Sequence, residues 1–169
     1  MADAASTTKT RNVLFLCTHN SARSVLAESL LGVLGKDRFR AFSAGSHPSG
    51  RVNPFAIELA RSISYPAECI RSKSWDEFAA PDAPHMDLVI TVCDNAAGET
   101  CPYWPGQPAT AHWGYADPSA GDAPDEAKLA AFGQTLQRIR VRLERLIELP
   151  AESFDPAALQ HAARELART

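Results

Sequence analysis

Short apolar runs alternate with amphipathic segments along the chain. Four runs have the length of strands: 13–16, 39–43, 88–92 and 110–113. The run at 88–92 is continuous and β-branched, which is typical of a parallel strand that is covered on both faces. Apolar residues recur at helical spacing in the other segments: 21–34, 55–63, 74–78, 125–149 and 156–168. This alternation predicts an α/β fold, with a small four-stranded parallel sheet flanked by helices.

The ends of the chain differ from its middle. Residues 1–11 are polar and contain no apolar stretch of the secretory kind, so we expect a disordered N-terminal tail. We expect residues 12–149 to form a single domain and residues 150–169, which begin with a proline, to form a C-terminal helical extension. The helix at 125–149 is predicted to lie on the sheet. A coiled-coil dimer is the alternative for the same spacing.

The composition is that of an ordinary globular protein. The chain has 169 residues, of which 45% are hydrophobic and 22% charged, and its net charge is −3. This charge gives no reason to expect nucleic acid or an anionic membrane as a partner. No apolar run reaches the roughly 20 residues of a transmembrane helix. We therefore expect a cytoplasmic protein, whose four cysteines are reactive or incidental rather than a disulfide framework.

The segment that follows the first apolar run has the strongest chemical signal. Residues 17–24 are Cys-Thr-His-Asn-Ser-Ala-Arg-Ser. A polar loop between a strand and a helix gathers backbone N–H groups around one point, and the helix adds the positive end of its dipole. Arg23 can close such a pocket around a tetrahedral oxyanion, and the same positive field favours the thiolate of Cys17. Ser24 can donate a hydrogen bond to that thiolate, and Asn20 suits the left-handed backbone of a tight loop. The alternative is a buried structural cysteine and a surface arginine.

Two further cysteines extend this chemistry. Cys93 directly follows a strand-like run, as Cys17 does, and ligands of parallel sheets bind beyond the carboxyl ends of the strands. If the bound oxyanion is arsenate, Cys93 can attack Cys17 and Cys101 can then attack Cys93, which leaves a disulfide for an external dithiol to reduce. An inert Cys93, or a zinc site of Cys93, Cys101 and His112, is the alternative. Cys69 has no evident partner.

A carboxylate follows the fourth apolar run. Asp117 lies in a loop, next to Pro118, which favours an extended conformation of the aspartate. A carboxylic acid at the rim of the sheet can give a proton to a leaving oxygen. An ordinary Asp-Pro turn is the alternative, and the spacing alone does not decide between them.

Together, these segments resemble the arsenate reductases built on the low-molecular-weight tyrosine phosphatase fold. The likeness covers roughly residues 12–147 and rests on four segments: 17–24, 43–45, 92–102 and 112–118. It implies a flavodoxin-like winding of the sheet, with Cys17 as nucleophile and Cys93 and Cys101 as a disulfide relay. It also implies Arg23 as the oxyanion clamp and Asp117 as the general acid. The implied oxyanion-binding loop comprises Thr18, His19, Asn20, Ser21, Ala22 and Ser24.

The resemblance leaves the reductant, a cation and the reaction open. Thioredoxin is the usual reductant of the three-cysteine branch, but the gap between Cys93 and Cys101 is slightly longer than in some members. A low-molecular-weight thiol with glutaredoxin is therefore the alternative. Some members bind potassium through residues that match Asn20, Glu28 and Ser43, but Trp75 stands near the position of the carboxylate that completes their site. The other possible functions are a tyrosine phosphatase that uses Cys17, Arg23 and Asp117, and an oxyanion-binding sensor.

Overall fold

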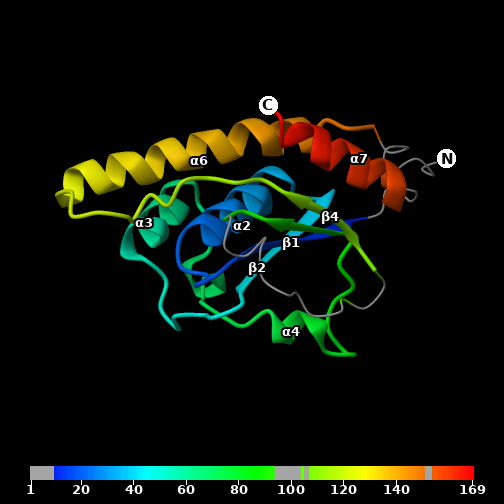
Figure 1. Cartoon of the computed structure of the whole chain (residues 1–169), viewed down its shortest axis with the longest axis horizontal. Coiled ribbons are helices and arrows are strands. Elements are labelled where there is room, and N and C mark those ends of the chain that lie inside the picture. The colour runs from blue at the N-terminus through cyan, green and yellow to red at the C-terminus, as the bar shows by residue number, and fades with distance from the viewer. Residues whose placement is uncertain (1–9, 94–103, 105–106, 151–153) are drawn as a thin grey trace.

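Four parallel strands form the centre of the computed structural model, which describes residues 10–93, 104, 107–150 and 154–169. In spatial order they are β2 (Phe39–Gly45), β1 (Arg11–Cys17), β3 (Leu88–Thr91) and β4 (Ala109–His112) (Figure 1). This order confirms the predicted α/β fold with flavodoxin-like winding. Residues 1–9 of the predicted tail and Cys101 lie outside the described residues.

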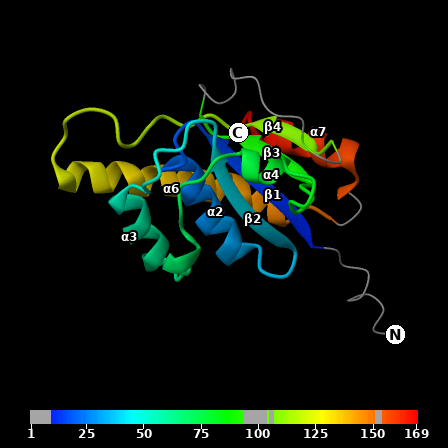
Figure 2. The same cartoon turned by 90° about the horizontal axis from the view of Figure 1, so that it is seen from below.

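The helices divide unequally between the two faces of the sheet. On one face, α2 (Arg23–Leu34), α3 (Pro54–Ser62), α6 (Asp125–Ile147) and α7 (Pro156–Leu166) share the main core (Figures 1 and 2). The short helix α4 (Asp76–Ala79) covers the other face, where Phe78 packs against a smaller cluster with Leu14 and Leu16. Successive β1 residues alternate between these cores, as the period of a strand requires. A 3-10 helix, η1 (Ala67–Cys69), follows α3.

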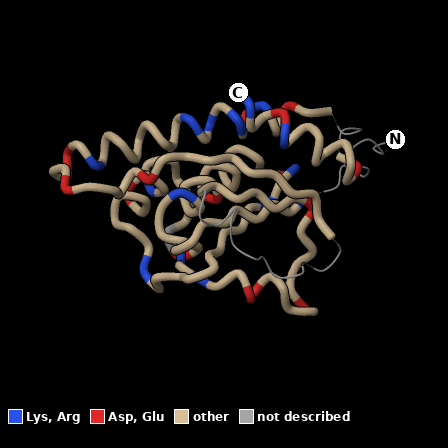
Figure 3. The backbone as a smooth tube through the Cα atoms, viewed as in Figure 1, with Lys and Arg blue, Asp and Glu red and all other residues tan. Residues whose placement is uncertain are grey.

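Helix α6 lies on the sheet, as its periodicity predicts. Its inward residues are buried in the main core, and Val141 is the only large hydrophobic residue exposed in the described part of the chain. The stripe that a coiled coil would use is thus already occupied. Acidic residues begin the helix and basic residues gather toward its end, which suits the helix dipole (Figure 3). No helix among the described residues has the length and apolar character needed to cross a bilayer.

Helix α7 packs on the last strand of the sheet. The indole N–H of Trp113 donates to the carbonyl of Ala163 at 2.8 Å, and the Thr110 N–H donates to Gln160 at 3.0 Å. Leu159 and Ala163 lie in the same core as the central strands. The predicted C-terminal helix therefore covers β4, which is the edge strand that would otherwise be open.

Some predicted boundaries shift at the start of β1 and around the loop that follows it. Arg11, expected in the tail, belongs to β1, because its N–H donates to Arg38 and its guanidinium lies over the Phe154 ring. Strand β2 continues past its predicted end at residue 43, because Gly45 pairs with Cys17. Helix α2 begins at Arg23 rather than at residue 21, since residues 18–22 form the loop.

Candidate active site

The loop after β1 is built against a glycine of β2. Cys17 ends β1 and is buried, and Asn20 has the left-handed conformation expected of it, with φ 49°. A Cβ atom on Gly45 would lie 2.5 Å from the Thr18 carbonyl oxygen and 3.0 Å from that of Cys17. Only glycine allows this close approach of two backbone segments. The backbone of Gly45 therefore packs directly against the backbone of the loop.

Buried hydrogen bonds direct a hydroxyl at the Cys17 sulfur. One amide N–H of Asn20 donates to Ser24 Oγ at 2.8 Å, and Ser24 Oγ lies 2.9 Å from Cys17 Sγ. Because Ser24 accepts from Asn20, its own hydrogen is left to point at the sulfur. A sulfur that accepts a hydrogen bond is stabilised as the thiolate. The role predicted for Ser24 is thus compatible with its position.

Behind Asn20 lies a buried carboxylate. Glu28 accepts hydrogen bonds from Ser43, at 2.5 Å, and from Tyr65, while the ammonium of Lys73 lies 3.9 Å from Glu28 Oε1. Burial raises the pKa of Glu28, although Lys73 and the two hydroxyls oppose the rise. Burial also lowers the pKa of Lys73, against the pull of Glu28. Burial and the nearby carboxylate both raise the pKa of Tyr65. The sequence drew attention to Glu28 and Ser43 but not to Lys73 or Tyr65.

Arg23 and Asp117 meet at the mouth of the loop. Arg23 donates to the Tyr115 carbonyl at 2.8 Å, and its guanidinium lies 3.9 Å from Asp117 Oδ2. Burial opposes ionisation of Asp117, but hydrogen bonds from Ser119 and the charge of Arg23 outweigh it, so the pKa of Asp117 is lowered. A small pocket is lined by Cys17, His19, Ser21, Ala22, Arg23, Asp117 and Ser119. The residues predicted as nucleophile, clamp and acid are therefore brought together.

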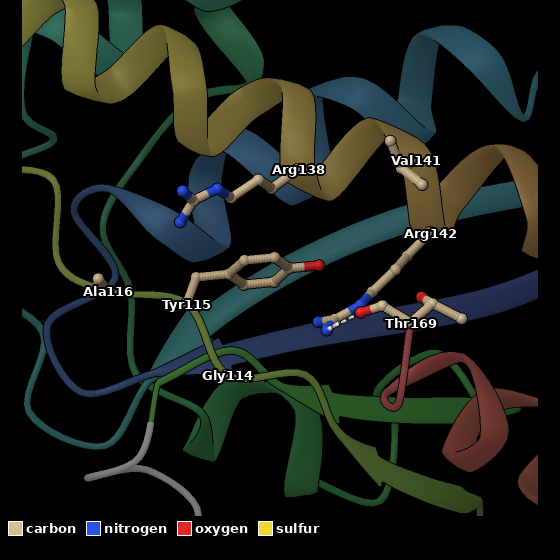
Figure 4. Close-up of a pocket in the computed structure, with 7 residues that line it drawn as sticks. All are labelled: Gly114, Tyr115, Ala116, Arg138, Val141, Arg142 and Thr169. Atoms are coloured by element: carbon tan, nitrogen blue, oxygen red, sulfur yellow. Dashed lines mark hydrogen bonds between the residues drawn. The ribbon is translucent and has the colours of Figure 1, made fainter.

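A larger cavity, of about 400 Å³, lies behind the segment that holds Arg23. It is lined by Gly114, Tyr115, Ala116, Arg138, Val141, Arg142 and Thr169 (Figure 4). The Arg142 guanidinium lies 5.0 Å from the centre of the Tyr115 ring and 6.0 Å from that of Trp113. The Tyr115 carbonyl accepts a hydrogen bond from Arg23. The stacking of Arg142 on the Tyr115 and Trp113 rings therefore helps to fix the segment that holds the Arg23 guanidinium. Sequence reasoning missed Arg142, which the helical spacing marks only as a polar position of α6.

Cys93 lies beside the same loop. It is buried, and its sulfur is 3.7 Å from the hydroxyl of Thr18, the residue that follows Cys17. The contact arises because the Val92 N–H donates to Leu16 at 2.8 Å, which aligns the ends of the two strands. The structure thus brings Cys93 to the Cys17 loop, while the pairing of Cys93 with Cys101 stays a prediction.

Cys69 does not line the small pocket, and the zinc alternative is not tested, because its member Cys101 lies outside the described residues. Cys69 is exposed, in η1. His112 hydrogen-bonds through Nδ1 to the Thr91 hydroxyl at 2.8 Å. Within the described part of the chain, no three His, Cys, Asp or Glu side chains are grouped so that they could hold a metal ion.

A parallel sheet, a cysteine loop at its rim and a facing arginine and aspartate define the class of phosphatase-fold proteins. The chain belongs to the low molecular weight phosphotyrosine protein phosphatase family, whose model matches residues 12–161. The resemblance seen in the sequence is therefore confirmed.

Several relatives of this chain within that fold are named arsenate reductases. The arsenate reductase of Bacillus licheniformis is 34% identical over 139 residues, which are 82% of this chain and 96% of the relative. A solved structure of an arsenate reductase in the phosphate binding state is 28% identical, with a TM-score of 0.62, and the match covers 82% of this chain and 97% of that one. The thioredoxin-dependent arsenate reductase of Corynebacterium glutamicum shares the fold at 23% identity, with a TM-score of 0.57 and coverage of 86% and 64%.

Proposed function

We propose that this protein reduces arsenate to arsenite. The observation that favours reduction over hydrolysis is the Cys93 sulfur, 3.7 Å from the hydroxyl of Thr18 in the Cys17 loop. A hydrolase needs one thiol and a water, whereas a reductase needs a second thiol close to the first. The curated relatives that align over most of the chain are named for this reduction.

In the proposed reaction, the Cys17 thiolate attacks arsenic and a hydroxyl leaves as water, with Asp117 supplying the proton. Arg23 and the loop N–H groups hold the remaining oxygens. The Cys93 thiolate then attacks the Cys17 sulfur. A disulfide forms, the electron pair of the sulfur–arsenic bond passes to arsenic, and arsenite leaves. Cys101 attacks Cys93, which releases Cys17 and leaves the Cys93–Cys101 disulfide.

An external dithiol must close this cycle. We propose thioredoxin as the reductant, with glutaredoxin and a low-molecular-weight thiol as the alternative, and the cytoplasm as the compartment that keeps them reduced. The test is arsenate-dependent oxidation of NADPH, once with thioredoxin and thioredoxin reductase and once with glutathione, glutaredoxin and glutathione reductase. Turnover with either system supports reduction and identifies the reductant. Absence of turnover with both would refute the proposed function.

Asp117→Asn is expected to lower kcat for arsenate about 10²-fold, because the leaving oxygen loses its proton donor. The lowered pKa makes Asp117 a carboxylate in the free protein at neutral pH. A bound oxyanion between Asp117 and Arg23 opposes that ionisation, so the acid is protonated in the complex. The wild-type kcat should therefore fall as pH rises through the pKa of Asp117 in the complex, and the asparagine variant should lack this fall.

The pH profile of kcat measures this directly. Ser119→Ala is the matched control, because it removes the side-chain hydrogen bond that lowers the pKa of Asp117 without removing the acid. The alkaline fall should move to higher pH in that variant. An asparagine variant that keeps both the rate and the alkaline fall would show that another group supplies the proton.

The family match gives a second function a specific basis. The loop, Arg23 and Asp117 would also serve phosphate ester hydrolysis, and the family model is that of a phosphotyrosine phosphatase. Hydrolysis of p-nitrophenyl phosphate tests it. Fast hydrolysis together with no arsenate turnover would make this the function.

A further inference from the structure

Lys73 is a buried cation on the inner side of the active-site loop. Lysine is rarely buried unless it is paired with an opposite charge. The side chains of Lys73 and of its partner Glu28 are each only 7% exposed. The ammonium lies 3.9 Å from Glu28 Oε1 and donates to the Arg71 carbonyl at 3.1 Å. It does not line the oxyanion pocket, so substrate binding does not explain its position.

The backbone of Lys73 is held in place as firmly as its charge. Its N–H donates to Asn20 Oδ1 at 2.9 Å, and its carbonyl accepts from the Gly45 N–H at 2.9 Å. Lys73 therefore bridges the loop residue Asn20 and the glycine on which the loop rests. A movement of this segment would reach both.

A directional chain of hydrogen bonds joins Glu28 to Cys17. Ser43 donates to Glu28 and accepts from Asn20 at 3.1 Å, and the same amide group donates to Ser24, which faces the Cys17 sulfur. Each donor in this chain is oriented by the one before it, as long as Glu28 stays an acceptor. A cation beside a buried carboxylate favours its ionised, accepting form.

A free potassium ion does not fit this site. Three residues match the potassium ligands of some family members: Asn20, Glu28 and Ser43. Here, the Asn20 oxygen is taken by the Lys73 N–H, and the Ser43 hydroxyl donates to Glu28. The charge of Glu28 is already balanced by the Lys73 ammonium. A bound potassium ion would have to displace a cation that is covalently attached to the chain.

We propose that the Lys73 ammonium is a built-in monovalent cation that replaces potassium in this protein. It keeps Glu28 an acceptor and thereby holds Ser43, Asn20 and Ser24 in the arrangement that positions Cys17. Lys73 is therefore a positioning residue. The proposal rests on the proposed function only in taking Cys17 as the nucleophile. Its removal should create a dependence on added potassium that the wild-type protein lacks.

The test compares wild-type protein with Lys73→Ala in potassium chloride and in choline chloride at equal ionic strength. In choline, the variant should melt about 6–10 °C lower than wild type, because a buried charge has lost its partner. Its Cys17 should react with iodoacetamide about tenfold more slowly, measured by peptide mapping with the exposed Cys69 as internal reference. Potassium should restore at least half of both losses in the variant and change neither in wild type.

Two further variants complete the design. Lys128→Ala, which removes a half-buried lysine of α6, should show neither loss. Lys73→Met with Glu28→Gln removes both charges and keeps the side-chain volumes. That pair should melt close to wild type and ignore potassium, but its Cys17 should remain slow.

Each outcome decides the matter. A potassium response of wild type, or a Lys73→Ala protein that is as stable and as reactive in choline as wild type, overturns the proposal. A Lys73→Ala protein that folds only in potassium supports the proposal. A Lys73→Ala protein that folds in neither salt overturns it, because potassium then cannot take the place of the Lys73 ammonium. Because melting and alkylation need no arsenate, a failure of the reductase function would appear separately, as absent turnover in wild type.

Discussion

Cys93→Ser is expected to lower arsenate turnover about 10³-fold or more while leaving p-nitrophenyl phosphate hydrolysis within about twofold of wild type. The reason is chemical. Serine is close in size to this buried cysteine and can keep the contact with Thr18, but a serine oxygen cannot form a disulfide with Cys17. Attack of Cys17 on the oxyanion is untouched, whereas the step that passes two electrons to arsenic is lost.

The measurement is steady-state arsenate reduction beside hydrolysis of p-nitrophenyl phosphate, on the same preparation. Cys69→Ser is the matched control, because Cys69 is exposed and has no place in the relay. It should leave both rates unchanged. Undiminished arsenate turnover in Cys93→Ser would remove the basis for the reductase proposal. An equal loss of both activities would show that Cys93 only supports the loop.

Cys101→Ser separates the order of the thiols from their identity. If Cys93 attacks first, a single arsenate turnover should trap a Cys17–Cys93 disulfide in this variant, because the thiol that would resolve it is missing. Mass spectrometry of the unreduced peptides identifies the bond. If the only product is an arsenic adduct of Cys17 with no bond to Cys93, then Cys93 does not attack first and the proposed order is wrong.

The sequence predicts the fold well because each strand is a local pattern. The continuous apolar run at 88–92 and the apolar run before Cys17 indicate parallel strands without any knowledge of their neighbours. The order of the strands then follows from the family resemblance and is confirmed by the structure. The boundaries that shifted depend on partners instead. Arg11 joins β1 because residue 38 accepts its N–H, and no property of Arg11 alone indicates that.

The candidate site divides in the same way. Cys17, Asn20 and Arg23 lie within one short segment, and their chemistry is visible in the order of the residues. Lys73 and Arg142 act through contacts that the folded chain alone creates. Lys73 reaches the loop from a segment 53 residues away, and Arg142 reaches Tyr115 from the middle of α6. Neither stands in a recognisable motif, and their residue types suggest only solvent-exposed charge.

Gly45→Ala is expected to cost about 2–3 kcal/mol of folding free energy and about 10²-fold in kcat. The backbone at Gly45 does not have a positive φ, so conformational strain is not the cause. The cost comes from space. The new methyl carbon would lie 2.5 Å from the Thr18 carbonyl oxygen and 3.0 Å from the Asn20 nitrogen, and both neighbours are backbone atoms of the catalytic loop. A side chain could rotate away, but here β2 or the loop itself must move.

Gly133→Ala makes the comparison quantitative. Gly133 lies within α6, and a Cβ atom there would meet nothing within 4 Å. Alanine should stabilise that helix by about 0.5–1 kcal/mol and leave kcat unchanged. Both variants replace glycine with alanine, and both are measured by thermal melting and arsenate kinetics. Any difference between them in stability or kcat therefore reports the surroundings of each glycine. If Gly45→Ala kept wild-type kcat, the loop would tolerate a displacement of its support, and the pocket geometry would not limit the rate.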